Sequence, residues 1–333
     1  MQTKQILFTA PKKAELAAVE LSPLKENEVL CRTIYSAVSQ GTEKANILDL
    51  PNTPGGKFPR NPGYCAVSRV EATGKAVSSV KPGDRVLVYH GFHAELVKIS
   101  ESNVLKVEDA AIDDREAAFV IVAAMGLGGL RRLGLEAGQS AAVVGLGILG
   151  ITALQFARLS GLCPLIAVDY NEIRRETALS LGADFALDPR DKDFVQKVKE
   201  ITGGGANGVV EVTGSSSAFV TALDITVRAG GVSLLGCTRI SDCPVDYYRQ
   251  IHHPGITVYG AHNMARPAVD SHPRNWTMKD DMRAILRWLS YRRVSFLPFL
   301  SKTESPENCQ AVYDEIISGK ESSIGILFDW SNR

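Results

Sequence analysis

The sequence predicts an α/β protein in which a doubly wound parallel sheet is inserted into a β-rich domain. From about residue 113 to residue 262, short apolar strands alternate with amphipathic helices, which is typical of a parallel sheet covered on both faces. Short strands and turns precede this region, and loops, two helices and a closing strand follow it. With 333 residues, the chain also exceeds the size of one hydrophobic core. We therefore expect the β-rich domain to begin over residues 1–118, the parallel sheet to occupy 119–262, and the chain to return to the first domain over 263–333.

Alternation of apolar and polar residues identifies the strands of the β-rich part. CRTIYSAVS (31–39) and YCAVSRVEATG (64–74) alternate, and VKPGDRVLVYH (80–90) places a Lys-Pro-Gly-Asp turn before an apolar strand. SIGILFDW (323–330) reads as the closing strand. A helix is expected over 113–135, because acidic residues begin it and two arginines stand near its end.

The parallel region reads as strand and helix in turn. The expected strands are residues 141–145, 164–169, 208–214, 232–236 and 256–262. The expected helices are residues 148–161, 171–182, 194–202 and 216–231, followed after a loop by 282–289 and by a helix that Pro306 opens. Asn171 is the expected N-cap of the second helix, and Gly182 is its expected stop.

Composition excludes several classes of protein. Lys and Arg number 37, as do Asp and Glu, so no basic surface for a nucleic acid is expected. The first residues, MQTKQILFTAPKK, lack the apolar core of a signal peptide, and the most apolar run, Ala117 to Leu130, is too short to cross a bilayer. None of the six cysteines forms a CxxC pair, which favours free thiols in a reducing compartment. We expect a cytoplasmic protein without a membrane or nucleic-acid partner.

The segment AAVVGLGILG carries the strongest motif, a GxGxxG pattern between an expected strand and an expected helix. Gly145 permits a tight turn, Gly147 lets a pyrophosphate approach the backbone, and Gly150 lets the helix pack close to the strand. The phosphates would lie at the helix N-terminus, beside Ile148 and Leu149, where free N–H groups favour an anion. The motif predicts a dinucleotide site.

Residues that follow the next strands complete this expectation. Asp169 ends a strand about twenty residues further on, where a carboxylate accepts the ribose hydroxyls of NAD and repels the 2′-phosphate of NADP. Tyr170 follows it, and Arg174 could stack on the adenine or pair with a phosphate, so NADP stays an alternative. Thr213 and Gly214 end the VEVTG strand at the same edge, where we expect contact with the nicotinamide half.

The chain resembles the medium-chain dehydrogenase/reductase superfamily over nearly its whole length. The resemblance rests on EVLCRTIYSAVSQGTE, NPGYCAVSRVEATGKAVSSVKPGDRV, HAELVKIS, GLGILG, AVDYNEIRRETALSLGAD and VTGSS. It implies a GroES-like catalytic domain with an inserted Rossmann domain, and a homodimer paired through the last strand of the Rossmann sheet. SQGTE with GYCAV and HAELV is similar to a branch that includes bacteriochlorophyllide dehydrogenase-like and sugar or polyol dehydrogenase-like proteins.

The departures from the superfamily concern its catalytic zinc. Zinc-dependent members place ligands where this chain has Ser39, the Gly-Tyr64-Cys65 segment and Ile121, and their four-cysteine lobe has no counterpart here. Zinc needs three or four converging ligands, and only Cys65 of these residues is one. We expect no metal site.

Without zinc, other groups must polarise a carbonyl and move a proton. The segments that line the cleft in the superfamily offer Tyr64 in place of a metal ligand, His93 as a proton shuttle, and Thr42 and Glu43 in the turn that approaches the nicotinamide. His90 is a further possibility.

These expectations describe a zinc-independent, NAD(H)-dependent oxidoreductase acting on a small alcohol or ketone, possibly sugar-like or polyol-like. Two alternatives stay open. One is an NADPH-dependent reductase of quinones or enones, against which Asp169 counts. The other is a dinucleotide-binding protein without turnover, which would bind NADH but oxidise no alcohol.

Overall fold

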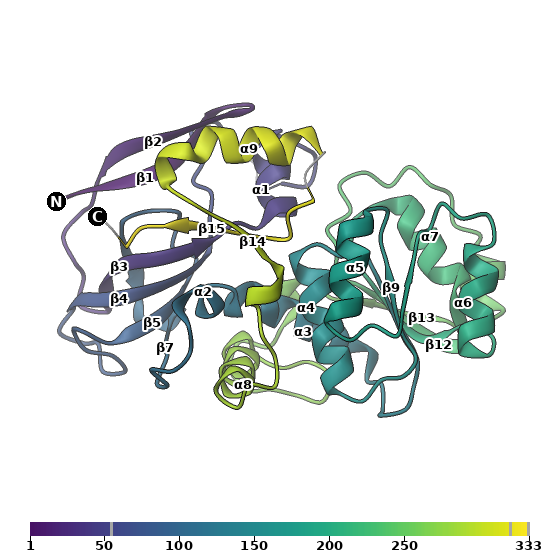
Figure 1. Cartoon of the computed structure of the whole chain (residues 1–333). Coiled ribbons are helices and arrows are strands. Elements are labelled where there is room, and N and C mark those ends of the chain that lie inside the picture. Colours follow the sequence, from purple (N-terminus) through teal and green to yellow (C-terminus); the bar gives the residue numbers. More distant parts are fainter. Residues whose placement is uncertain (54–55, 320–321, 332–333) are drawn as a thin grey trace. The chain divides into compact units, whose positions relative to one another are not determined.

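A computed structural model of the chain describes residues 1–53, 56–319 and 322–331 (Figure 1). The chain forms two compact units, Met1–Val122 with Leu286–Arg333, and Ala123–Ile285. The second unit contains a parallel sheet with helices, and the first contains a mostly antiparallel sheet. The predicted fold class is therefore confirmed. No helix among the described residues is long and apolar enough to span a bilayer.

The sheet of the second unit is doubly wound. Its described strands lie in the order β10-β9-β8-β11-β12-β13, and every neighbouring pair is parallel. The strands are β8 (Ala141–Val144), β9 (Leu165–Val168), β10 (Phe185–Leu187), β11 (Ala206–Glu211), β12 (Thr226–Leu234) and β13 (Thr257–Gly260). The chain starts at β8, builds outward to β10, and then returns to build from β11 to β13. The order therefore reverses between β8 and β11, which is where open α/β sheets bind ligands.

Helices cover both faces of this sheet. They are α3 (Val120–Leu133), α4 (Ile148–Leu159), α5 (Glu172–Ser180), α6 (Phe194–Thr202) and α7 (Ser216–Asp224), and α8 (Met278–Ser290) follows later in the chain. Side chains of α6 and α7 pack in one core with Ala142 and Val144 of β8. Gly150 of α4 instead faces Val143, whose side chain points to the opposite face because side chains alternate along a strand. Both faces of the parallel sheet are thus buried, as the continuous apolar runs of its strands in the sequence predict.

Three sequence predictions for this unit need comparison with the structure. Helix α6 covers Phe194–Thr202 as predicted, and the Asn171 side chain caps α5 by accepting from the Arg174 N–H. The helix predicted over 216–231 is wrong beyond Asp224, because the chain turns into β12 at Thr226. Its β-branched residues and the pairing of β12 with both β11 and β13 favour a strand.

The first unit contains a sheet in the order β14-β15-β3-β4-β5-β7, with β6 paired to β3, and a two-stranded β1-β2 sheet. The strands are β1 (Gln2–Ala10), β2 (Lys13–Glu20), β3 (Glu28–Ala37), β4 (Cys65–Thr73), β5 (Arg85–Tyr89), β6 (Leu96–Ser100), β7 (Val104–Lys106), β14 (Leu300–Glu304) and β15 (Gly325–Asp329). The predicted strands at 64–74, 80–90 and 323–330 contain β4, β5 and β15, and the one predicted at 31–39 overlaps β3, which begins earlier, at Glu28. The last strand, β15, pairs with β3, so both ends of the chain build one sheet.

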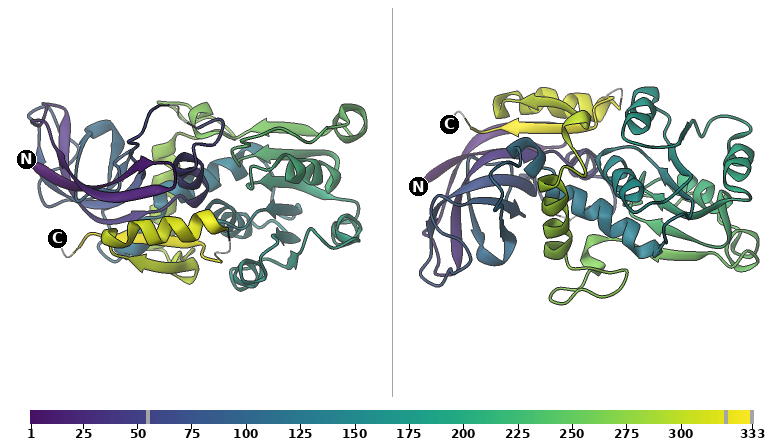
Figure 2. Two further views of the ribbon diagram at one scale, coloured as in Figure 1. Left: turned by 90° about the horizontal axis from the view of Figure 1, so that it is seen from above. Right: turned by 60° about the horizontal axis from the view of Figure 1, so that its bottom comes forward.

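Three helices accompany this sheet: α1 (Gln40–Ile47), α2 (Asp114–Ala117) and α9 (Cys309–Ser318). Helix α9 lies beside the β1–β2 pair, where the Ala14 N–H donates to Gln310 (2.7 Å; Figure 2). Two predictions need correction. The turn expected around Thr42 is the first turn of α1, and the helix expected over 113–135 is divided into α2 and α3. Pro306 begins a short 3-10 turn that leads into α9.

Candidate functional site

The glycine-rich turn after β8 brings helix α4 into direct contact with the sheet. Gly145 has φ +96°, and a Cβ there would lie 2.8 Å from the Thr213 Cγ2 atom. A Cβ at Gly150 would lie 1.8 Å from the Gly145 carbonyl oxygen, so any side chain there would push α4 away. Gly147, the N-cap of α4, has open space where its Cβ would be, and no side chain caps the helix. The N-terminus of α4 can therefore accept an anion at close range.

Asp169 lies at the end of β9, next to this turn. Its carboxylate accepts from the Leu146 N–H at 2.7 Å and from the Asn171 N–H at 2.8 Å. A carboxylate offers about four acceptor positions, so two remain for ribose hydroxyls. The Asp169 side chain thus ties the two turns together and suits the sugar of a dinucleotide.

The residues after Asp169 form a partly exposed shelf. Tyr170 is 57% exposed, and the Arg190 guanidinium lies 5.6 Å from the centre of its ring. Arg175 donates to the backbone oxygens of Asp169 (2.8 Å) and Tyr170 (3.0 Å), so it supports the strand end. Arg174 lies in the first turn of α5 and is half-buried.

The turn after β11 lies on the other side of the glycine-rich turn. Thr213 contacts Gly145. Gly214 has φ +69°, and a Cβ at Gly214 would lie 2.6 Å from the Cys237 carbonyl oxygen. Because β9, β8 and β11 are neighbours in a parallel sheet, their three turns lie in a row at its carboxyl edge. The structure thus gathers the predicted dinucleotide residues at one edge of the sheet, which we call the dinucleotide edge. They are Gly145, Gly147, Ile148, Leu149, Gly150, Asp169, Tyr170, Arg174, Thr213 and Gly214. The Ile148 side chain is buried, so it can offer a ligand only its backbone.

Sequence reasoning missed Glu211, the last residue of β11. Its side chain is fully buried and accepts hydrogen bonds from the N–H groups of Thr213 (2.7 Å) and Gly214 (3.2 Å) and from the Thr213 hydroxyl. Burial raises the pKa of Glu211, although these hydrogen bonds lower it in part. A charged residue inside the apolar segment GVVEV was the signal that could have identified it.

The four predicted catalytic residues lie together in the first unit, around the start of α1. Glu43 is buried, and its carboxylate accepts from the Ser39 N–H (2.8 Å), the Tyr313 hydroxyl (2.6 Å) and His93 Nε2 (3.1 Å). Burial alone would raise the pKa of Glu43, but the charge and hydrogen bond of His93, with the other two donors, lower it below its ordinary value. Glu43 is therefore an ionised acceptor, which puts a proton on Nε2 of His93.

His93 is enclosed on every side. Its side chain is fully buried, Nδ1 lies 2.7 Å from the Ser36 hydroxyl, and the ring contacts Phe328 edge-on at 5.1 Å between centroids. The Trp330 indole donates to the same hydroxyl at 2.9 Å. Phe328 of β15 and Trp330, which follows that strand, thus bring side chains from the last part of the sequence to His93 and Ser36.

Tyr64 and Thr42 lie on the more open side of the network. The Tyr64 hydroxyl donates to Ser39 Oγ at 2.6 Å and is also hydrogen-bonded to Thr42. Burial raises the pKa of Tyr64 far above its ordinary value, so its proton stays in place. Ser39 links the two halves, because its hydroxyl binds Tyr64 and its N–H binds Glu43. His90 is instead an exposed residue that stacks on Tyr89.

The residues at the positions of the superfamily's zinc ligands do not match zinc chemistry. Ile121 is apolar and fully buried, and the Ser39 and Tyr64 hydroxyls bind each other. Cys65 is buried, and burial with the nearby charge of Glu43 raises the pKa of its thiol well above the ordinary value. Over residues 1–53, 56–319 and 322–331, no group of three His, Cys, Asp or Glu side chains could hold a metal.

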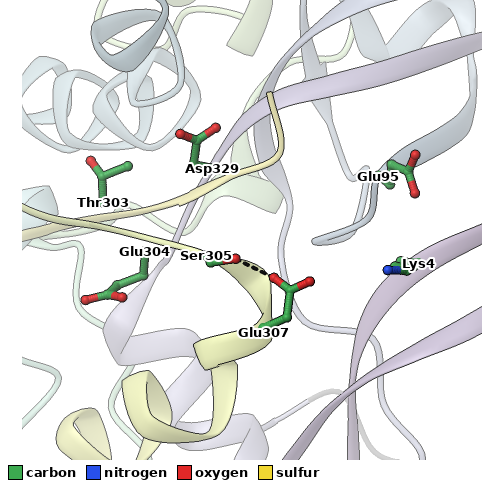
Figure 3. A pocket seen from close by; sticks show the side chains of 7 residues that line it. All are labelled: Lys4, Glu95, Thr303, Glu304, Ser305, Glu307 and Asp329. Carbon is green, nitrogen blue, oxygen red and sulfur yellow. Dashed lines mark hydrogen bonds between the residues drawn. The ribbon is translucent and has the colours of Figure 1, made fainter. Parts of the chain in front are cut away.

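A cavity of about 700 Å³ in the first unit lies outside these clusters (Figure 3). It is lined by Lys4, Glu95, Thr303, Glu304, Ser305, Glu307 and Asp329. Each of its carboxylates already accepts a hydrogen bond from a neighbouring residue, and Glu95 pairs with Arg32 at 2.7 Å. The acidic lining is therefore explained by local pairing, and it contains none of the predicted site residues.

Comparisons with known proteins agree with this geometry. Residues 149–273 match the family model described as zinc-binding dehydrogenase. An alcohol dehydrogenase of Geobacillus stearothermophilus is 26% identical over 280 residues, covering 75% of this chain and 81% of the relative. An L-threonine 3-dehydrogenase of Pyrococcus furiosus is 35% identical over 125 residues, which are 37% of this chain and 36% of the relative. The chain is thus similar to zinc-binding dehydrogenases and alcohol dehydrogenases. The expected class of enzyme, an alcohol dehydrogenase-like oxidoreductase, is confirmed at this level.

Solved structures show the same fold along the whole chain. The alcohol dehydrogenase TADH from Thermus sp. ATN1 has a TM-score of 0.82 at 20% identity, covering 98% of this chain and 99% of that one. The 2R,3R-butanediol dehydrogenase from Bacillus subtilis has the same score, identity and coverage. The matched family model spans 149–273 and so excludes Ser39, Tyr64, Cys65 and Ile121. Its description therefore says nothing of the metal-binding capacity of this chain.

The lowered pKa of Glu43 predicts a specific pH dependence of stability. A carboxyl group with a lowered folded-state pKa stabilises the fold fully above its unfolded value, here 4.5, and loses that contribution as the pH falls through the folded value. In urea titrations from about pH 7 to about pH 4, we expect Glu43→Gln to lower the free energy of unfolding by about 1–3 kcal/mol at the upper end. The difference from wild type should shrink below pH 4.5.

The exposed substitution Glu26→Gln is the matched control, because it also removes one carboxylate from the same unit. A Glu43→Gln deficit that stays constant over the whole pH range would contradict an ionised, hydrogen-bonded Glu43.

Proposed function

We propose that the chain is an NAD(H)-dependent oxidoreductase that interconverts a small alcohol, sugar-like or polyol-like, and its ketone. The observation that carries the proposal is the row of turns at the carboxyl edge of the parallel sheet, with the Asp169 carboxylate beside the open N-terminus of α4. A bound nicotinamide would supply hydride transfer there. The names of the relatives, alcohol dehydrogenase and 2R,3R-butanediol dehydrogenase, support this substrate class.

The preference for NAD rests on Asp169. Two of its acceptor positions bind backbone N–H groups, which leaves the others for ribose hydroxyls, and a 2′-phosphate there would meet a negative charge. NADP is the competing assignment, because Arg174 follows in the first turn of α5. A putative zinc-binding dehydrogenase of Sinorhizobium meliloti with 19% identity is known with NADP bound.

We expect NADH to bind at least about tenfold more tightly than NADPH, a difference of about 1.4 kcal/mol. Asp169→Ser should narrow or reverse this preference, because it removes the charge that repels the 2′-phosphate. Fluorescence titration of both cofactors measures the ratio. The control is Asp224→Ser, at the opposite ends of the strands, which should leave the ratio unchanged. Equal affinities in the wild type would refute the NAD assignment.

We propose Tyr64 and Thr42 as the residues that handle the substrate oxygen. The Tyr64 phenol keeps its proton, which it donates to Ser39 Oγ here, and turning that O–H toward the substrate would let it donate to an oxygen that gains charge. The burial of His93 and Glu43 favours a supporting role, in which they hold the start of α1, and with it Thr42, in place. This chemistry needs no zinc, in keeping with a donor set in which Cys65 is the single usual zinc ligand beside Ser39, Tyr64 and Ile121.

Tyr64→Phe is expected to lower kcat by roughly 10²–10⁴, the usual effect of removing a positioned acid–base group. The affinity for NADH should stay within about threefold, because Tyr64 lies outside the dinucleotide edge. Turnover can be followed as NADH formation with NAD⁺ and a panel of secondary alcohols and polyols. Tyr291→Phe removes an exposed hydroxyl from the same unit and serves as the control.

Elemental analysis of the same preparations tests the absence of a catalytic metal. Treatment with a chelator should change neither NADH affinity nor turnover. Stoichiometric zinc in the wild type, or full activity of Tyr64→Phe, would overturn the proposed chemistry.

We further propose a homodimer paired through β13. In the described part of the second unit, β13 is the last strand of the sheet, and it pairs with β12 on one side. An edge strand that is left open favours pairing with another chain, and a twofold axis would let two copies join their sheets. Light scattering at micromolar concentration should give about twice the 36.0 kDa mass of the chain. A mass near that of one chain would count against pairing.

We retain the cytoplasm as the expected location. The cysteines are free in the structure, three of them buried, as expected for a protein kept in a reducing compartment. Fractionation of the source cells, with the chain detected by an antibody, would test this expectation.

A further inference from the structure

Glu211 is an unusual residue to find at the end of a buried strand. Its side chain is fully buried between apolar strands, and the two residues before it are buried valines. Its Oε1 atom accepts three hydrogen bonds, whereas Oε2 is buried without a hydrogen-bond partner among the described residues. A buried polar atom without a partner costs free energy, and a valine here would avoid that cost. We therefore look for the reason for a carboxyl group at this position in the hydrogen bonds that Oε1 accepts.

The bonded oxygen fixes the turn that follows β11. Two of its donors are the backbone N–H groups of Thr213 and Gly214, and the third is the Thr213 hydroxyl. That hydroxyl in turn accepts from the Ser215 N–H at 3.0 Å, at the start of α7. One carboxyl oxygen thus determines the backbone path from the end of the strand to the first turn of the helix.

This turn is packed between its two neighbours with no free space. A Cβ on Gly145 would meet the Thr213 Cγ2 atom at 2.8 Å and the Thr213 backbone nitrogen at 3.2 Å, and a Cβ on Gly236 would meet the Gly214 nitrogen at 2.4 Å. Backbone therefore lies directly on backbone at three consecutive strand ends, β8, β11 and β12. A change in the turn held by Glu211 would therefore shift the neighbouring turns and alter the surface that the three turns form together.

We propose that Glu211 is the positioning residue for the nicotinamide half of the dinucleotide. The inference rests on the proposed function and deepens it. Asp169 at the end of β9 would hold the adenosine ribose and the turn after β8 the phosphates, so the rest of the cofactor extends in the same direction, over β11. Thr213 and Gly214 are the residues that it would reach, and Glu211 acts through them without touching the cofactor itself.

The chemistry of the side chain suggests which variant should preserve its role. Burial raises the pKa of Glu211, which favours the uncharged carboxyl group. Glutamine has the same shape and keeps an acceptor oxygen for the three donors. Leucine fills a similar volume but leaves the N–H groups of Thr213 and Gly214 without their acceptor. Comparing Glu211→Gln with Glu211→Leu therefore distinguishes the effect of the hydrogen-bond acceptor from the effect of side-chain volume.

The test compares NADH with ADP-ribose, which lacks the nicotinamide ring, as ligands of the full-length protein. We expect Glu211→Leu to weaken NADH binding at least about tenfold and ADP-ribose binding less than about threefold. Glu211→Gln should keep both affinities within about threefold of wild type. Val210→Ala on the same strand is the control, because it creates a buried cavity and lowers the unfolding temperature without touching the turn. The ratio of NADH affinity to ADP-ribose affinity in Val210→Ala should equal the ratio in the wild type.

The possible failures are distinguishable. If the wild type binds neither ligand, the proposed function is wrong and the role of Glu211 is lost with it. If the wild type binds both, but Glu211→Leu weakens them equally or not at all, then only the positioning role is wrong. A Val210→Ala ratio that shifts as much as that of Glu211→Leu would also overturn it, because loss of stability alone would then account for the effect.

Discussion

The contact between Gly150 and the Gly145 carbonyl oxygen sets the geometry of the whole dinucleotide edge. Since a single methyl group at residue 150 would overlap that oxygen, helix α4 can lie against the turn only with hydrogen in its place. The close contact brings the N-terminus of α4 to the end of β8, and it fixes the Leu146 N–H that Asp169 accepts. It also leaves Gly145 against Thr213, so the turn after β11 is placed by the same contact. Backbone packing, more than side-chain chemistry, builds this site.

The network in the first unit follows a different principle. There a buried negative charge on Glu43 collects donors from α1, from His93 and from α9. A buried carboxylate that lost one of these donors would be costly to keep, so the charge holds its neighbours in fixed positions. Ser39 and Tyr64 lie at the margin of this network and are oriented by it. A rigid, ionised interior thus supports the polar groups that a substrate would meet.

Much of the dinucleotide edge could be predicted from the sequence because its determinants are local. The spacing of Gly145 and Gly150, the place of Asp169 and the cap at Asn171 each depend on a few neighbouring residues. The end of α7 could not be placed in this way, because pairing of β12 with two other strands decides where the helix stops.

The hydrogen bonds of the network around Glu43 could not be predicted from the sequence either. Thr42, Glu43 and His93 could be proposed as site residues from resemblance, but not their partners. Tyr313 binds Glu43, and Trp330 binds Ser36 beside His93, each from more than two hundred residues away in sequence. Periodicity carries no information on such contacts. Glu211 differs again, since its charge within an apolar strand is visible in the sequence, but its hydrogen bonds depend on the path of the turn.

The pairing of β15 with β3 has a consequence for the order in which the protein is made. Synthesis proceeds from the N-terminus, and domains generally fold as units as they emerge. The parallel sheet is complete once β13 has been synthesised, whereas β3 must wait for β15, and Ser36 for Trp330. The second unit can therefore fold before residues 325–330 have been made. The first unit needs those residues, so the parallel sheet can form before the polar network around Glu43.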